Sequence, residues 1–259
     1  IENFLPDEEF SALEVELAEI RRSLDVDRSR HDYGKNFVST FYDISNTRAD
    51  YPAFARLQAN KTISDIARSV SRRRRSSFLP KLIIQSLGRA APSQPHEDYE
   101  GSSYLHIDRH YHHVKAFFYL SDVSDDCAPY SYVKGSHKLS WSRLKYEYRI
   151  GKEYSRKVYK QGHTKDRKER LANIERLGKK FLSESGLSET RIVGKKNTLI
   201  ISNNAGLHRR ADMGDVGQRV TVMMPFAYLE SAAHILYPLL KRWEFAERQS
   251  EPFENTEST

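Results

Sequence analysis

Residues 102–137 read SSYLHIDRHYHHVKAFFYLSDVSDDCAPYSYVKGSH, and the rest of the chain is organised around them. Near the start of this stretch is the triplet His106-Ile107-Asp108. We expect an extended strand at 103–109, in which residues two apart point to the same face. An imidazole and a carboxylate would then share one space. One more histidine would complete the 2-His-1-carboxylate set that holds non-haem Fe(II) and leaves positions open for oxygen chemistry.

The candidate third ligand is His208, which lies in the stretch NTLIISNNAGLHRRADMGDVGQRVTVMMPFAY at 197–228. A strand is expected before it, and residues 208–218 are expected to form a polar turn region because they contain two glycines. Another strand is expected to begin at Arg219. This order places His208 and Arg219 on neighbouring segments.

Arg219 is the candidate anchor for an anionic co-substrate, because a guanidinium binds a carboxylate through two parallel hydrogen bonds. Thr221 lies two residues further along the same expected strand face and would add a hydroxyl. Arg209 and Arg210 remain alternatives to Arg219, although their place directly after His208 also suits contact with the substrate.

Four pieces in this order resemble the phytanoyl-CoA dioxygenase-like family of Fe(II)- and 2-oxoglutarate-dependent oxygenases. They are the His106-Ile107-Asp108 triplet, a Gly-Ser-His turn that ends at His137, the distal His208, and Arg219 eleven residues beyond it. The resemblance covers about 102–140 and 198–226. Lys134 departs from the family, which usually has proline before the Gly-Ser-His turn.

The resemblance implies a double-stranded β-helix, a cupin-like jelly roll with helices packed on one sheet. Carried over residue by residue, it implies that His106, Asp108 and His208 bind Fe(II). Arg219, with Thr221 nearby, would hold 2-oxoglutarate. The implied reaction uses O2, decarboxylates 2-oxoglutarate to succinate and hydroxylates an unactivated C–H bond. The carboxylate of Asp108 argues for hydroxylation, because halogenating relatives have a small residue at that position.

The other histidines have simpler interpretations. His137 belongs to a turn that is structural in the resembling family. His96, His163 and His234 are expected to be ordinary surface residues. The run of histidines and polar residues at 109–113 either lines the mouth of the pocket or faces solvent.

Composition favours one folded domain spanning 1–259, with hydrophobic residues at 38% and aromatic residues at 11%. We expect an α+β fold with a mainly β core and flanking helices. The single cysteine, Cys127, excludes an internal disulfide and favours a reducing, cytoplasmic location. No apolar run is long enough to span a bilayer. Because the numbering begins at Ile1, we expect a trimmed chain, with or without a targeting segment.

The positive charge is concentrated in one segment. Residues 138–196 contain 18 Lys and Arg against 7 Asp and Glu, although the whole chain carries only +7. We expect a basic helical insertion at about 138–190, interrupted near Gly151 and Gly162. Two interpretations stay open: a surface that recruits an anionic group, or a solvated helical region.

The remaining elements follow from hydrophobic period and breakers. Helices are expected at 2–24, 51–59 and 61–71, the last capped by Thr62 or Ser64. A loop is expected at 91–99. Strands are expected at the following ranges: 36–44, 81–87, 114–121, 128–133, 190–193, 197–202 and 219–228.

Three functions are weighed. The first is hydroxylation of an anionic small molecule, or of a lipid-linked one such as a lipopolysaccharide sugar, with the tail at 234–245 touching a membrane surface or packing on the core. The second, which is disfavoured, is a nucleic-acid oxygenase or binder with tyrosines such as Tyr146 and Tyr148 stacking on bases. The third is a non-catalytic binding protein. The sequence does not indicate the oligomeric state.

Overall fold

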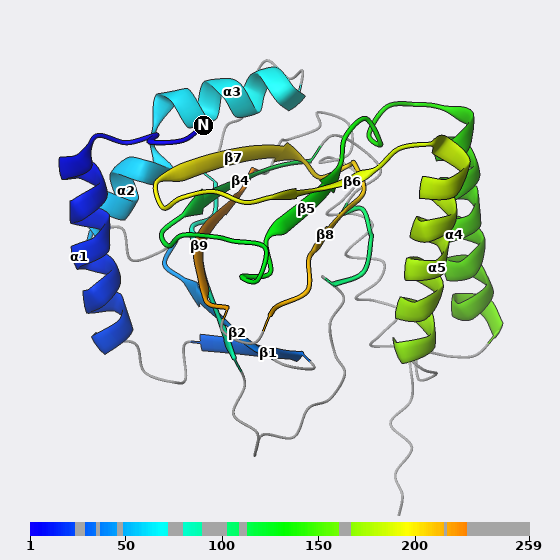
Figure 1. Cartoon of the computed structure of the whole chain (residues 1–259), viewed down its shortest axis with the longest axis horizontal. Coiled ribbons are helices and arrows are strands. Elements are labelled where there is room, and N and C mark those ends of the chain that lie inside the picture. Colours follow the sequence, from blue (N-terminus) through cyan, green and yellow to red (C-terminus); the bar gives the residue numbers. More distant parts are fainter. Residues whose placement is uncertain are drawn as a thin grey trace, which may run out of the picture.

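The chain folds into two antiparallel β-sheets with helices on both outer sides, as the computed structural model shows (Figure 1). The structure describes residues 1–23, 29–34, 37–45, 49–71, 80–89, 103–108, 113–160, 167–214 and 217–226. The predicted loop at 91–99, most of the histidine run, and the tail at 234–245 lie outside these residues, as do His96, His163 and His234.

Nine strands and five helices are assigned within the described residues. The helices are α1 (Asp7–Ser23), α2 (Pro52–Gln58), α3 (Lys61–Ser71), α4 (Trp141–Lys160) and α5 (Arg167–Ser185). The strands are β1 (Ser29–Gly34), β2 (Phe37–Asp43), β3 (Ile83–Arg89), β4 (Val114–Tyr119), β5 (Tyr130–Val133), β6 (Glu189–Ile192), β7 (Thr198–Asn203), β8 (His208–Arg210) and β9 (Arg219–Pro225).

The larger sheet has the strand order β1-β2-β3-β9-β4-β7, and the smaller sheet has the order β6-β5-β8. Chain neighbours are often not sheet neighbours, since β9 is inserted between β3 and β4. This crossing of antiparallel strands between two facing sheets is the jelly-roll arrangement expected from the sequence. The fold-class prediction is therefore confirmed.

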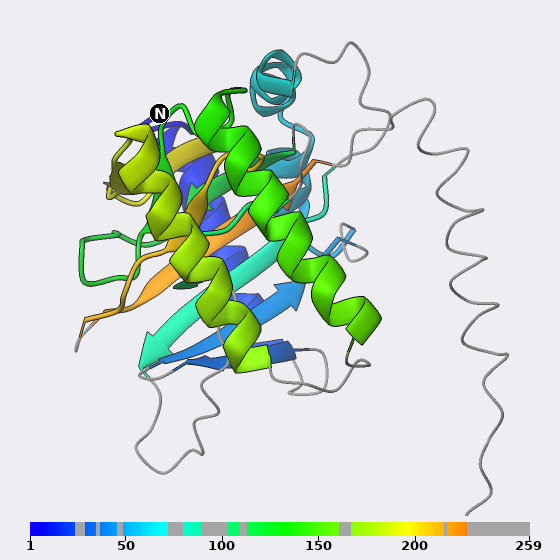
Figure 2. The same cartoon turned by 90° about the vertical axis from the view of Figure 1, so that its right-hand side faces the viewer.

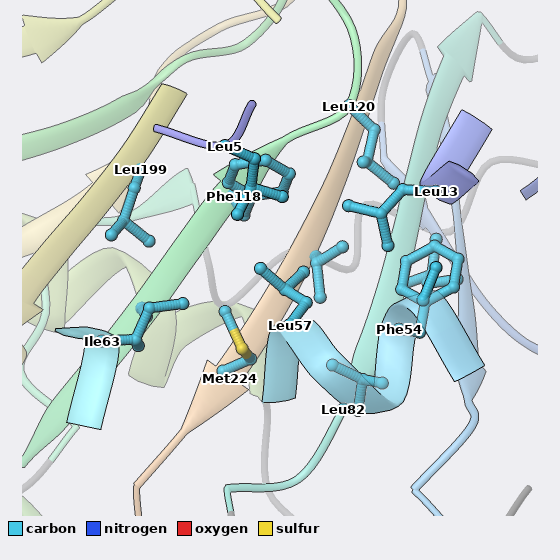
Figure 3. Close-up of a cluster of buried hydrophobic side chains, with 14 of the residues drawn as sticks. Leu5, Leu13, Phe54, Leu57, Ile63, Leu82, Phe118, Leu120, Leu199 and Met224 are labelled. Atoms are coloured by element: carbon cyan, nitrogen blue, oxygen red, sulfur yellow. The ribbon is translucent and has the colours of Figure 1, made fainter. Parts of the chain in front are cut away.

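Helices α1, α2 and α3 cover the outer face of the larger sheet (Figure 1). Alternate residues of β4 and β9 pack beneath them, for example Phe118 and Met224 (Figure 3). The alternation of strand side chains sends the intervening residues into the space between the two sheets. Phe117 and Ile200 belong to the cluster in that space. The functional side chains of the larger sheet point into the same space.

The α1–α2 contact includes a buried charged group. The carboxylate of Glu16 accepts hydrogen bonds from the backbone N–H groups of Ala53, at 2.6 Å, and Phe54, at 3.0 Å. These are free N–H groups at the start of α2, where a negative charge is favourable. Glu16 therefore fixes the two helices that cover one end of the sheet.

Helices α4 and α5 form a hairpin that covers the outer side of the smaller sheet (Figure 2). Tyr146 of α4 and Phe181 of α5 pack edge to face, with ring centroids 5.6 Å apart. Gly178 presses on the segment before the His-x-Asp triplet, because an added Cβ would lie 2.8 Å from the Cβ of Leu105. The hairpin thus supports the stretch that carries His106 and Asp108.

Four predictions about elements were wrong. Residues 103–108 form no strand and touch the sheet through one bridge, His106 to His208. The region after His208 begins with strand β8 rather than a turn. Helix α4 continues through Gly151 without a break. The side chain that caps α3 is Asn60, whose Oδ1 accepts from the N–H of Ile63 at 3.2 Å.

Candidate metal centre

Two distant stretches of chain meet at the candidate metal centre. His106 and His208 exchange two backbone hydrogen bonds, from His106 N–H at 3.0 Å and from His208 N–H at 2.9 Å. Asp108 donates its own N–H to the carbonyl of Asn204 at 3.0 Å. One ligand atom from each of His106, Asp108 and His208 lies within 4.8 Å of the other two. The structure therefore brings together the three residues predicted as ligands.

Each histidine offers its Nε2 atom to the cluster. The Nδ1 atom of His106 lies 2.6 Å from the carbonyl of Tyr104, and that of His208 lies 2.9 Å from the carbonyl of Gly206. A carbonyl can only accept, so both Nδ1 atoms carry the proton. The Nε2 atoms then carry lone pairs that can bind a metal, which is the arrangement that metal-ligating histidines usually adopt.

The charges of the cluster also suit a divalent cation. Burial, followed by the proximity of His208, lowers the pKa of His106 to about 4, so its imidazole is neutral at pH 7. For Asp108, burial acts to raise the pKa, but contacts with His208 and the Lys115 ammonium outweigh it, and the pKa lies well below its usual range. The site thus presents a neutral imidazole at His106 and an ionised carboxylate at Asp108.

Two residues that sequence reasoning missed bind one oxygen of Asp108. The Nζ atom of Lys115 lies 2.7 Å from Oδ2, and the Nδ2 atom of Asn204 donates to the same oxygen at 2.9 Å. Lys115 is the one charged residue of β4, which is otherwise apolar or aromatic. That charge in an apolar strand was the available signal. Nothing in the sequence distinguished Asn204 from its neighbour Asn203.

The Gly-Ser-His turn acts on the centre through Ser136. Its hydroxyl accepts a hydrogen bond from the N–H of Leu207 at 2.7 Å, and its carbonyl accepts one from Arg143 of α4 at 2.7 Å. Gly135 has φ +89, a conformation that favours glycine. His137 lies outside the ligand cluster, with Nδ1 3.4 Å from the hydroxyl of Tyr132. The turn therefore holds the chain next to His208.

Arg219 and Thr221 lie on β9 and point into the space between the sheets, as their alternation with Val220 and Val222 requires. The Arg219 guanidinium donates to the carbonyl of Ala128 and to Oε1 of Gln85. Its Nε atom and the Thr221 hydroxyl are buried and have no hydrogen-bond partner. Burial lowers the pKa of Arg219 to about 10, so it stays charged at pH 7.

Gln85 on β3 is a further residue that sequence reasoning missed. It pairs with Thr221 across the two strands, accepts from Arg219 at 3.2 Å, and donates to the Ser39 hydroxyl at 2.9 Å. Its amide therefore fixes the plane of the guanidinium. Gln85 is buried. The only signal in the sequence was a glutamine in a strand with apolar neighbours.

The alternatives to Arg219 are placed differently. Arg209 is half-buried and forms an ion pair with Glu189 at 2.6 Å. Arg210 is buried on β8, two residues from His208 on the same strand face. Cys127 is a free thiol, partly exposed, with its sulfur 3.3 Å from the Ser124 hydroxyl.

A cavity of about 750 Å³ lies at the edge of the two sheets. Tyr132 of β5 forms part of its wall, and Tyr132 pairs directly with His208 across the strands. Ser202 also lines it, and its hydroxyl lies 2.7 Å from that of Tyr130. His137 and Lys138 also line it, together with Ser69 of α3.

Several cations of the basic segment form ion pairs with neighbouring carboxylates. The pairs include Arg149 with Glu184, Lys179 with Glu175, Arg191 with Asp125, Lys195 with Asp122, and Lys196 with Glu14. These contacts favour the interpretation of a solvated helical region. Tyr146, proposed above to stack on bases, is 2% exposed and belongs to the core. In the part of the chain that the structure describes, no helix combines the length and apolar character needed to cross a membrane.

The family model for phytanoyl-CoA dioxygenase (PhyH) matches residues 1–175. No curated protein sequence matches the chain. Among solved structures, the alpha ketoglutarate dependent epimerase SnoN from nogalamycin biosynthesis is 14% identical, with 90% of this chain and 80% of SnoN covered and a TM-score of 0.53.

The alpha ketoglutarate dependent carbocyclase SnoK from the same biosynthesis is 13% identical, with 92% and 84% covered and a TM-score of 0.51. AviO1 from Streptomyces viridochromogenes Tue57 is 12% identical, with 88% and 87% covered and a TM-score of 0.50. Identities this low support the shared fold alone. The family is shown by the family model, which matches more than half of the chain. The chain belongs to the phytanoyl-CoA dioxygenase family of Fe(II)- and 2-oxoglutarate-dependent oxygenases.

Proposed function

We propose that the protein is a 2-oxoglutarate-dependent hydroxylase that uses Fe(II) and O2 to oxidise an unactivated C–H bond of an anionic small molecule. The observation that supports it best is the cluster of His106, Asp108 and His208, whose ligand atoms lie within 4.8 Å of one another. The donor set fits Fe(II), because two imidazoles and one carboxylate leave positions for a co-substrate and O2.

In this proposal the three side chains hold the metal through both Nε2 atoms and the carboxylate. When bound, ferrous iron together with 2-oxoglutarate and O2 supplies the oxidant for C–H hydroxylation. The protein keeps His106 neutral and Asp108 ionised at pH 7, so the ligands require no change of protonation before they bind the metal. The presence of Asp108 favours hydroxylation over halogenation, as argued from the sequence.

Arg219 and Thr221 would hold the far carboxylate of 2-oxoglutarate. The buried Nε atom and the Thr221 hydroxyl, both without a partner, are a donor pair that a carboxylate would satisfy. Gln85 and the Ala128 carbonyl keep the guanidinium in place on its other side. A charged donor that is positioned in advance loses little freedom on binding.

The cavity beside Tyr132 is our candidate substrate site. Its volume of about 750 Å³ suits a small molecule, and Lys138 adds a cation to its wall. SnoN and SnoK belong to nogalamycin biosynthesis, which agrees with a small-molecule substrate at the level of the fold. The anionic character of the substrate rests on Lys138 in the cavity wall.

A lipid-linked substrate is the second candidate. Leu139, Trp141, Leu144 and Tyr148 are exposed at and just before the start of α4, with Trp141 at 80%. Aromatic side chains beside lysines suit a membrane surface. Cosedimentation with vesicles containing phosphatidylglycerol would support a lipid-linked substrate. Recovery of all the protein in the supernatant would instead favour a free small molecule as the substrate.

The decisive experiment incubates the protein with Fe(II), ascorbate, 2-oxoglutarate and a metabolite extract. We expect succinate formation, and a product heavier than its precursor by one oxygen atom in mass spectrometry. The Asp108→Ala variant serves as the matched control. Absence of succinate with every extract fraction, in protein that binds iron, would instead favour a non-catalytic binding protein.

A further inference from the structure

We propose that Asn204 is the positioning residue of the metal centre: it holds Asp108 so that only Oδ1 is offered to the metal. The inference rests on the proposed function, because it assigns Asp108 as a ligand. Asn204 is completely buried and directly follows β7. It is one of two adjacent asparagines. Its side chain reaches the ligand cluster, whereas that of Asn203 accepts from the N–H of Ala205.

The side chain of Asn204 contacts two of the three ligands. One N–H of Nδ2 donates to Oδ2 of Asp108 at 2.9 Å. The second faces Nε2 of His208 at 3.0 Å, and this nitrogen can accept because Nδ1 carries the proton. A metal bound to Nε2 would take its lone pair and leave the amide to the carboxylate.

The orientation of the amide is fixed from behind. The hydroxyl of Tyr130 donates to Oδ1 of Asn204 at 3.3 Å and lies 2.7 Å from the Ser202 hydroxyl. An amide with its oxygen held by Tyr130 must turn its nitrogen toward Asp108.

The backbone of Asn204 makes the same connection. Its carbonyl accepts the N–H of Asp108 at 3.0 Å, and its own N–H donates to the carbonyl of His113 at 2.6 Å. Asp108 is thus held by both its main chain and its side chain. Lys115 also contacts Oδ2, but its ammonium is at the end of four flexible methylenes, so Asn204 is the part that sets direction.

The consequence for Asp108 is a difference between its two oxygens. Oδ2 has two donors, Lys115 and Asn204. Oδ1 lies 3.7 Å from Nε2 of His106, and Oδ2 lies 3.6 Å from Nε2 of His208. The two oxygens therefore differ in their donors and not in their distance from the histidines. Because Lys115 and Asn204 occupy Oδ2, Asp108 would offer Oδ1 to a metal and leave a further position for co-substrate. Partners of this kind around metal ligands are worth a factor of about 10 to 100 in metal affinity.

The test measures binding of Co(II) alone to the metal-free protein, without 2-oxoglutarate or substrate. We expect Asn204→Ala to weaken Co(II) binding by about tenfold to a hundredfold, and to change the visible absorption of the bound ion. Asn203→Ala is the matched control. Asn203 also accepts a buried hydrogen bond, from the N–H of Ala205 at 3.2 Å, but it does not contact a ligand in the described hydrogen bonds.

The control separates positioning from general stability. Both variants lose buried hydrogen bonding, and their melting temperatures record the general destabilisation. Only Asn204→Ala should lose metal affinity. Tyr130→Phe is a second variant. It removes the hydroxyl that holds Oδ1 of Asn204 but keeps the Asn204 amide. We expect a smaller loss of Co(II) affinity than in Asn204→Ala.

Two results would overturn the inference: Co(II) affinity within about twofold of wild type in a folded Asn204→Ala protein, or equal losses in both asparagine variants. If wild type itself binds no Co(II), or if His106→Ala binds as well as wild type, the metal centre is wrong and the proposed function fails with it. A failure confined to Asn204 leaves the proposed function intact.

Discussion

At the metal centre, the atoms that would not face the metal are tied to the protein. The Nδ1 atom of each histidine is hydrogen-bonded to the carbonyl two residues earlier in the chain, at Tyr104 and at Gly206. Asp108 uses Lys115 and Asn204. The ligand residues could be predicted because their chemistry and spacing are visible in the sequence. Their supporting partners could not, since a carbonyl has no sequence signature and Asn204 resembles any other asparagine.

Replacing Asp108 tests the metal ligand. We expect Asp108→Ala to abolish hydroxylation, because the site loses its only anionic ligand and the ammonium of Lys115 is left without its carboxylate. Succinate and product formation, measured with saturating iron, check this result. Asp122→Ala removes an exposed carboxylate that pairs with Lys195 and should leave turnover unchanged. Near-normal turnover in Asp108→Ala would remove Asp108 from the site.

Replacing Arg219 tests the co-substrate anchor. We expect Arg219→Ala to weaken 2-oxoglutarate binding by about 2–3 kcal/mol, the cost of a lost charged hydrogen-bonding partner. Anaerobic calorimetry with Fe(II) or Ni(II) bound would measure it. Arg209→Ala, which loses an ion pair with Glu189, should bind 2-oxoglutarate normally. The opposite pattern, with Arg209→Ala impaired and Arg219→Ala unaffected, would transfer the role to Arg209.

At the scale of elements, strong periodic patterns predicted well and irregular stretches did not. The strand at 36–44 and the helix at 61–71 agree with β2 and α3 to within one residue at each end. The His-x-Asp stretch failed as a strand because only His106 forms a β-bridge, with His208 on a distant segment, and the N–H of Asp108 bonds to Asn204 outside any strand. Strand β1 was not predicted, since its sequence SRHDYG is polar and its order depends on pairing with β2.

Gly178 tests whether the helical hairpin supports the metal centre. A Cβ at this position would lie 2.8 Å from the Cβ of Leu105 and 3.1 Å from its carbonyl oxygen. We expect Gly178→Ala to cost about 1–3 kcal/mol of folding free energy, through overpacking, and to weaken Co(II) binding by moving the adjacent His106.

Gly151 provides the control for that variant. It lies in α4 on the exposed side, and an added Cβ would meet nothing within 4 Å. Gly151→Ala should therefore stabilise the protein by about 0.5–1 kcal/mol, because alanine has the higher helix propensity. Denaturant titration measures both. A Gly178→Ala protein with unchanged stability and metal affinity would show that the hairpin does not support the ligand stretch.

At the scale of the whole molecule, the two sheets enclose the functional residues, and helices cover both outer faces. The larger sheet contributes Gln85, Arg219 and Thr221, and the smaller sheet contributes His208. Sequence reasoning predicted this division only through the family resemblance. Hydrophobic period alone gives strands, but it does not say which of them become neighbours.

The titration of His106 predicts a pH dependence of the stability of the metal-free protein. Its pKa falls from 6.5 to about 4 on folding, so the unfolded chain binds more protons between these values. Stability is therefore greatest above pH 6.5 and declines as the pH falls through 4, by about 3–4 kcal/mol at most from this group. The lowered pKa of Asp108 acts in the same direction at lower pH.

Denaturant unfolding at pH 7 and pH 4.5 checks this dependence, with His106→Asn as the comparison. Between pH 7 and pH 4.5, the free energy of unfolding should fall less in the variant than in wild type. An equal loss in both proteins would mean that His106 is not neutral and buried in the folded state.

The paired backbone bonds between His106 and His208 have one more consequence. They join residues about a hundred positions apart using peptide groups alone. The ligands are thus assembled by the completed polypeptide, and the ion is not needed as a cross-link. Treatment with a chelator should accordingly yield an intact, inactive apoprotein that regains activity when ferrous salt is restored, without a cycle of denaturation and refolding.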